Sequence, residues 1–117
     1  MTEEAENLRN LIFQKYPQTA EELTKLVQDE IDLFCKKQND YGTNNVTKGQ
    51  DLNTPEGKRV ALAALIFRID DKVQRLVNLV IKNPSSSALN ESIQDSFIDI
   101  SLLAKIALIV DSGKWAK

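Results

Sequence analysis

The sequence predicts an all-α protein: a helical bundle of three long helices and one short N-terminal helix. Glycine and proline are scarce, at four and three of the 117 residues, and they fall between the periodic segments. Apolar residues recur within those segments at the three- and four-residue spacing of an amphipathic helix. The length fits one domain over residues 1–117, large enough to bury a modest core without disulfides.

The first two helices follow from their stripes and their end signals. A short helix is expected over about residues 3–15, and Pro17 ends it. Thr19-Ala-Glu-Glu22 has the pattern of a capping box, which places the start of a second helix there and its end near residue 39. The residues expected to face the core are Leu8, Leu11, Ile12 and Tyr16 on the first helix, and Leu23, Leu26, Val27, Ile31 and Phe34 on the second.

The second half of the chain begins with a polar, turn-rich connection over residues 40–53, a length that is uncommon between helices unless the segment is functional or disordered. Thr54-Pro55 supplies an N-cap and a proline in the first turn of a third helix that reaches about residue 82. After a break at residues 83–87, a last helix runs from about residue 88 to residue 111, and Ser112-Gly113 caps it.

Composition excludes several classes of function. The net charge of −2 disfavours a protein that binds nucleic-acid polymers or an anionic membrane. The chain contains no histidine, which excludes His-based acid–base catalysis, Ser–His and Cys–His nucleophiles and ordinary zinc sites. With one cysteine, no apolar run of membrane-spanning length and an acidic N-terminus, a cytoplasmic protein is expected.

Acidic residues interrupt two of the apolar stripes. Glu30 shares the direction of Val27 and Phe34 on the second helix. On the last helix, Glu91, Asp95 and Asp99 form a column at four-residue spacing. A carboxylate on a core-facing stripe needs a cation or a metal to offset its desolvation.

The partners of these acids remain open at this stage. Arg68, Lys72 and Arg75 on the third helix could pair with them, and an acidic column is also often just a solvated face. Glu30 by itself could be a partly exposed boundary residue. A divalent ion is the third possibility, and a ligand set of oxygens alone selects Mg²⁺ or Mn²⁺.

Three segments carry a resemblance to a known family: Lys37-Gln-Asn-Asp-Tyr-Gly42, Lys72-Val-Gln-Arg-Leu76 and Glu91-Ser-Ile-Gln-Asp-Ser-Phe-Ile-Asp99. In order and helix placement, they resemble the nucleotide modification associated domain type 1 family. That family is carried largely by bacteriophages and lies within the MazG-like superfamily of all-α nucleoside triphosphate pyrophosphatases. The resemblance implies a dimer or tetramer that cleaves a nucleotide to a monophosphate and pyrophosphate with Mg²⁺, in the host cytoplasm.

The resemblance also implies roles for individual residues. Glu30, Glu91 and Asp95 would be the catalytic metal ligands, and Asp99 a further ligand or a residue that supports them. Asp40 and Tyr41 would contact metal, sugar or base. Lys72 and Arg75 would meet the phosphates. Glu30 is then expected to lie across the bundle from Glu91 and Asp95, within one chain or across a dimer interface.

The chain departs from the family pattern at three points. The paired-acid first motif is reduced to Glu30 with Asp29 beside it, the second motif reads Glu-x-x-x-Asp, and Ile100-Ser-Leu-Leu follows Asp99. A catalytically weak nucleotide-binding protein, such as one that sequesters a host-defence signal, is therefore the main alternative. A plain helical interaction protein is the third.

A second apolar stripe on the last helix predicts a homo-oligomer. A helix that is apolar nearly all round should be covered all round. The stripe comprises Leu89, Ile93, Ile100, Leu103, Ala107 and Val110.

Overall fold

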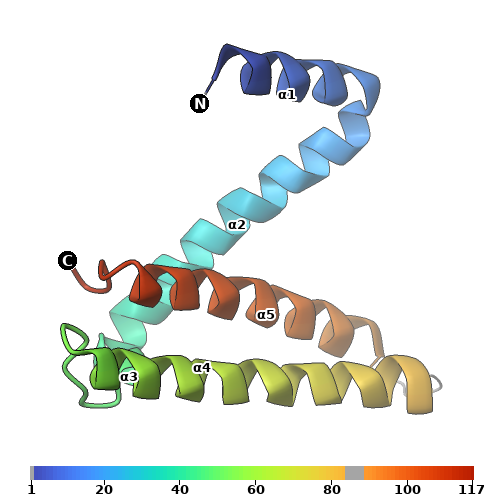
Figure 1. Cartoon of the computed structure of the whole chain (residues 1–117). Helices are drawn as coiled ribbons and strands as arrows, with labels where there is room; N and C mark the ends of the chain where they lie inside the picture. Colours follow the sequence, from blue (N-terminus) through green and yellow to red (C-terminus); the bar gives the residue numbers. More distant parts are fainter. Residues whose placement is uncertain (1, 84–88) are drawn as a thin grey trace. The chain divides into compact units, whose positions relative to one another are not determined.

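The computed structural model describes residues 2–83 and 89–117, with the side chains of residues 89–91 outside this description. Within these ranges, the chain consists of helices and turns without a strand, which confirms the all-α prediction (Figure 1). The elements are α1 (Glu3–Lys15), α2 (Pro17–Tyr41), α3 (Asn44–Thr47), α4 (Pro55–Leu76), a π-helical segment η1 (Val77–Lys82) and α5 (Leu89–Asp111).

The chain divides into two compact units, Met1–Lys36 and Lys37–Lys117. The boundary falls inside α2, so the last turn of this helix belongs to the second unit. The expectation of a single domain over the whole chain stays a prediction.

The first unit corrects one predicted helix start. Helix α1 has the expected bounds, and its N-cap Thr2 accepts a hydrogen bond from the Ala5 amide at 3.1 Å. Helix α2, however, begins at Pro17 and not after Thr19, and the Ala20 amide already donates to the Tyr16 carbonyl at 3.0 Å. Proline is well suited to the first helical turn because the amide that it lacks would have no partner there. The capping box was therefore the wrong start signal.

The apolar stripes of α1 and α2 do not form a core in this chain. No residue of these two helices, all of which the structure describes, is buried. Leu8, Leu11 and Leu23 each expose more than half of their surface, while Phe34 is half-buried. The periodicity predicted the helices correctly, but the residues expected to face the core are not buried within the first unit.

The second unit is built on an antiparallel pair, α4 and α5, which lie side by side (Figure 1). Thr54 caps α4 as predicted, with its hydroxyl oxygen accepting from the Gly57 amide at 3.0 Å. Lys58 near the start of α4 donates to the carbonyl of Asp111 at the end of α5, at 2.9 Å. The contact between Lys58 and Asp111 places the start of α4 beside the end of α5.

The core of this unit lies where the first half of α4 meets the second half of α5. The buried side chains are Ala61 and Leu65 of α4, Leu102, Leu103, Ile106 and Val110 of α5, Val46 of α3 and Trp115 of the tail. Leu103 and Val110 were expected on a stripe that faces a partner chain. The structure buries both within the chain itself.

The connection between α2 and α4 is closed by the C-terminal tail. Gly113 has a φ of +77°, and its amide donates to the Val110 carbonyl at 3.1 Å, which confirms the predicted helix cap. Beyond it, the indole of Trp115 donates to the carbonyl of Thr43 at 3.4 Å. The short helix α3 within this connection was not predicted.

Gly57 allows the connection to return close to α4, which leads to a stability prediction. A Cβ at Gly57 would overlap the carbonyl oxygen of Asp51. We expect Gly57→Ala to destabilise the protein by about 1–3 kcal/mol, against the gain that alanine ordinarily brings to a helix. Chemical denaturation measures this, and Arg59→Ala at an exposed position two residues later is the control. A Gly57→Ala protein as stable as the parent would contradict the close approach.

Candidate functional site

The face that α4 presents to α5 changes from apolar to cationic halfway along the helix. Ala61 and Leu65 are followed at helical spacing by Arg68, Lys72 and Arg75. The facing column of α5 changes in the same way, from Leu103 and Ile106 in the core to Asp99, Ser96 and Ser92. The helix pair therefore has an apolar half and a polar half, and we call the latter the polar half of the α4–α5 pair.

Asp99 is the centre of charge in the polar half. Its Oδ2 lies 3.1 Å from Nζ of Lys72, and its Oδ1 lies 3.4 Å from Nζ of Lys37. The Asp99 side chain is 23% exposed, so solvent screens these pairs only in part. Because Lys37 comes from the last turns of α2, the cluster joins three helices of the second unit.

Ser92 and Ser96 are the two serines of α5 in the polar half of the α4–α5 pair. The Nη2 atom of Arg75 donates to the hydroxyl oxygen of Ser92 at 3.0 Å. Ser96 is 1% exposed, and its hydroxyl donates to the Ser92 carbonyl at 2.8 Å. A buried serine is satisfied by such a bond within its own helix. The guanidinium of Arg75 thus reaches α5 at Ser92 while the Arg75 side chain stays exposed.

Arg68 stands at the inner end of the cationic column, one turn beyond the buried Leu65. Its Nη1 atom is shielded from solvent and has no hydrogen-bond partner among the residues that the structure describes. A buried donor without an acceptor is rare in folded proteins and costs free energy. The sequence offered Arg68 only as one available cation, and the spacing to Lys72 and Arg75 was the signal for its position.

The structure brings some of the predicted site residues together. Lys72 and Asp99 are in direct contact, and Arg75 lies on the same face of α4. Asp95 is exposed on α5. The partner of Asp99 that sequence reasoning missed is Lys37, which lies 62 positions away in the chain and follows no local pattern.

Other predicted residues lie elsewhere. Asp40 and Tyr41 are exposed at the C-terminal end of α2. Glu30 is half-buried and belongs to the first unit. The side chain of Glu91 lies outside the described residues. The expected juxtaposition of Glu30 with Glu91 and Asp95 stays a prediction.

The acids fit a hard divalent cation by their chemistry. All four predicted ligands are carboxylates, the donors that Mg²⁺ and Mn²⁺ prefer. Among the side chains that the structure describes, those of residues 2–83 and 92–117, no three acidic or thiol groups gather closely enough to hold a metal ion. Since both oxygens of Asp99 are paired with lysines, its geometry fits better with holding Lys37 and Lys72 in place than with direct metal ligation.

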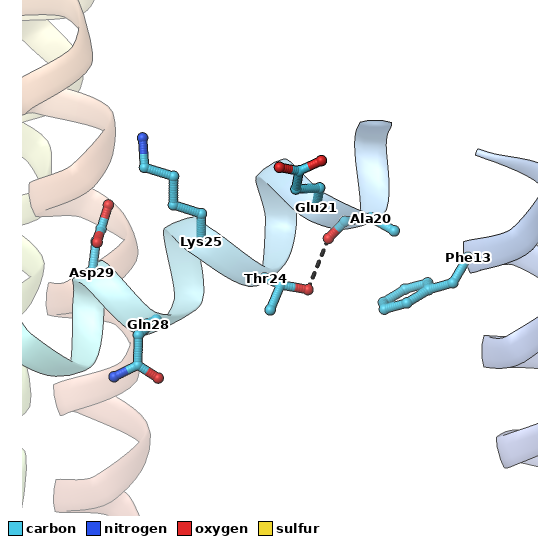
Figure 2. A pocket seen from close by; sticks show the side chains of 7 residues that line it. All are labelled: Phe13, Ala20, Glu21, Thr24, Lys25, Gln28 and Asp29. Carbon is cyan, nitrogen blue, oxygen red and sulfur yellow. Dashed lines mark hydrogen bonds between the residues drawn. The ribbon is translucent and has the colours of Figure 1, made fainter. Parts of the chain in front are cut away.

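One hollow of the first unit is an alternative candidate site. It has a volume of about 530 Å³ and lies between Phe13 of α1 and a row of α2 side chains (Figure 2). Its charged lining residues are Glu21, Lys25 and Asp29, which leave one net negative charge and no attraction for an anionic ligand. The hydroxyl of Thr24 donates to the Ala20 carbonyl at 2.8 Å and is therefore already satisfied. The side chains that line this hollow therefore form no recognisable catalytic or phosphate-binding site.

Two further findings frame the function. In the part of the chain that the structure describes, each helix is too short or too polar to cross a membrane. Comparisons of the chain with protein-family models, with curated proteins and with solved structures find no match.

Proposed function

We propose that this chain is a Mg²⁺-dependent nucleotide pyrophosphohydrolase that converts a (deoxy)nucleoside triphosphate into a monophosphate and pyrophosphate. The observation that carries the proposal is the gathering of Lys37, Lys72 and Arg75 in the polar half of the α4–α5 pair. The segments that hold these cations are the same ones that resemble the phage-borne family. The proposed setting is phage nucleotide metabolism in the host cytoplasm.

The cations supply the phosphate-binding part of the proposal. A triphosphate carries several negative charges, and lysine and arginine bind its oxygens through charge-assisted hydrogen bonds. Asp99 holds the two ammonium groups of Lys37 and Lys72 close together despite their mutual repulsion. The same cations would stabilise charge that develops on the leaving pyrophosphate.

The predicted acids and Tyr41 supply the metal-binding and nucleoside-binding parts of the proposal. Glu30, Glu91 and Asp95 would hold Mg²⁺, with Mn²⁺ as an alternative. The bound metal supplies an activated water and neutralises phosphate charge, which needs no histidine. Tyr41 is 64% exposed, so its ring is open to stacking against a base, and Asp40 beside it is open to the sugar.

A panel of NTPs and dNTPs with Mg²⁺ or Mn²⁺, read out as pyrophosphate release, tests the proposal. We expect release that depends on the metal and falls by about 10–100-fold in Lys72→Met, because a phosphate contact worth about 1.5–3 kcal/mol is lost. Lys82→Met, at an exposed position of η1 in the same unit, is the matched control and should retain the parent rate. Equal losses in both variants would show that general charge and not this site is responsible.

A nucleotide-binding protein without catalysis is the second candidate, and one observation favours it. Both oxygens of Asp99 face lysines, which compete with any metal for this carboxylate. The two candidates differ in one result. The binding protein would take up a nucleotide with a 1:1 stoichiometry in calorimetry and release no pyrophosphate from it in the presence of Mg²⁺.

We also propose that the chain forms a homo-oligomer through its first unit. Helices α1 and α2 bury none of their residues in the single chain, yet both carry continuous apolar stripes. Most of the stability of a helix in a protein comes from packing its apolar face. A second copy that covers these stripes would provide that packing.

A further inference from the structure

We propose that Arg68 is a phosphate-binding residue at the inner end of the polar half, where its guanidinium receives an oxygen of the polyphosphate chain. This inference deepens the proposed function and rests on its phosphate-binding part alone. It does not depend on hydrolysis or on a bound metal.

The Arg68 side chain carries a polar atom without a partner. Its Nη1 atom is buried and, within the described residues, lacks a hydrogen-bond partner. An arginine cannot relieve this by losing its proton, because the guanidinium remains charged at any ordinary pH. Buried polar atoms in folded proteins are nearly always paired. An acceptor from outside the chain would complete this one.

The nearest acidic acceptor of α5 is already engaged. Contacts of Lys58 with Asp111 and of Arg75 with Ser92 fix the antiparallel register, which places Arg68 at the level of residues 99–101. At that level Asp99 is the acidic residue, and each of its oxygens already faces a lysine.

The neighbouring acceptors are also accounted for. By the same register, Asp95 lies nearer the level of Arg75, more than one helical turn from Arg68. The hydroxyl of Ser96 is engaged with the Ser92 carbonyl. The described part of α5 therefore offers Arg68 no unused carboxylate at its own level.

The arrangement of the cations on α4 indicates the kind of anion that fits. Arg68, Lys72 and Arg75 follow one another along one face of α4, so their charges form a line and not a point. A chain of linked phosphates presents oxygens along a line as well. The planar fork of a guanidinium matches two oxygens of one phosphate, which gives Arg68 a role that an ammonium cannot fill.

Inorganic tripolyphosphate added to the full-length chain without metal or nucleoside is the probe. We expect calorimetry to show binding by the parent that weakens about 10-fold or more in Arg68→Met. Arg59→Met, at an exposed position of the same helix, should bind as the parent does. Without the anion, Arg68→Met should melt at the parent temperature or above it, because an unpaired buried donor has been removed.

Arg68→Lys keeps the charge and loses the fork, so its affinity should fall between those of the parent and Arg68→Met. This variant decides the matter if Arg68→Met fails to fold. Undiminished binding by a folded Arg68→Met, or by Arg68→Lys where Arg68→Met does not fold, would overturn the inference and leave the proposed function standing.

The remaining outcomes separate the two proposals. A parent that does not bind tripolyphosphate would overturn the inference, while metal-dependent pyrophosphate release from a nucleotide would still support the proposed function. Arg68-dependent binding in a protein that releases no pyrophosphate from any nucleotide would support the inference and contradict hydrolysis. A lower melting temperature for Arg68→Met with full binding would make Arg68 a purely structural residue.

Discussion

Asp95→Asn is expected to abolish pyrophosphate release, by about 100-fold or more, together with any rise in melting temperature caused by Mg²⁺. Asp95 is the proposed ligand that lies exposed on α5, one turn after Glu91 in the sequence. A metal that binds only the folded state stabilises it by mass action, and the loss of a ligand removes that effect. The metal-free variant should be as stable as the parent or more so, because one repelling charge has gone. Thermal melts with and without Mg²⁺ measure the difference.

Asp99→Asn is the matched control, one turn further along α5. It removes the carboxylate that pairs with Lys37 and Lys72, so it should lower the stability of the metal-free protein by about 1 kcal/mol. If Mg²⁺ leaves the parent unchanged and Asp95→Asn behaves like Asp99→Asn, the acidic column is a set of ion pairs. That result would end the metal-dependent part of the proposal.

Val27→Asp is expected to convert the proposed homo-oligomer into a monomer. Val27 lies in the middle of the α2 stripe and is 47% exposed in the single chain. Burying a carboxylate there in place of an apolar side chain should cost about 3 kcal/mol, or more than 100-fold in the association constant. Light scattering at micromolar concentration measures the mass, and helicity should fall with it if α1 and α2 depend on the partner.

Gln28→Asp adds the same charge at the neighbouring position, which lies off the stripe, and should leave the assembly intact. A parent that is monomeric at these concentrations, with α1 and α2 still helical, would contradict the proposal. The stripe would then be stable without a partner.

Helix ends were predictable from sequence where the signal is local. Thr54 and Gly113 were identified correctly because a cap depends on a few neighbouring residues. Thr19 gave a wrong start for α2 because a threonine followed by acidic residues also occurs inside a helix. The helix already begins at Pro17. The four-residue helix α3 was missed since it contains a single buried residue, Val46, and no periodicity to detect.

The direction of each apolar stripe was harder to predict than its existence. The stripe of α2 and the core of α5 look alike in sequence, but only the second is buried within the chain. Periodicity reports that a helix has a face to cover and says nothing about which chain covers it. Likewise, Lys37 lies far from Asp99 in the sequence, and only the tertiary fold brings the two together.

The position of Trp115 gives the protein an internal optical reporter. It is the single tryptophan of the chain, and it is buried where the tail closes over the connection between α2 and α4. Indole emission depends on exposure to water, so its wavelength follows the state of the unit Lys37–Lys117. The unit Met1–Lys36 contains no tryptophan and is silent in this signal. Fluorescence and circular dichroism therefore observe different parts of one molecule, and any divergence between them distinguishes local from global unfolding.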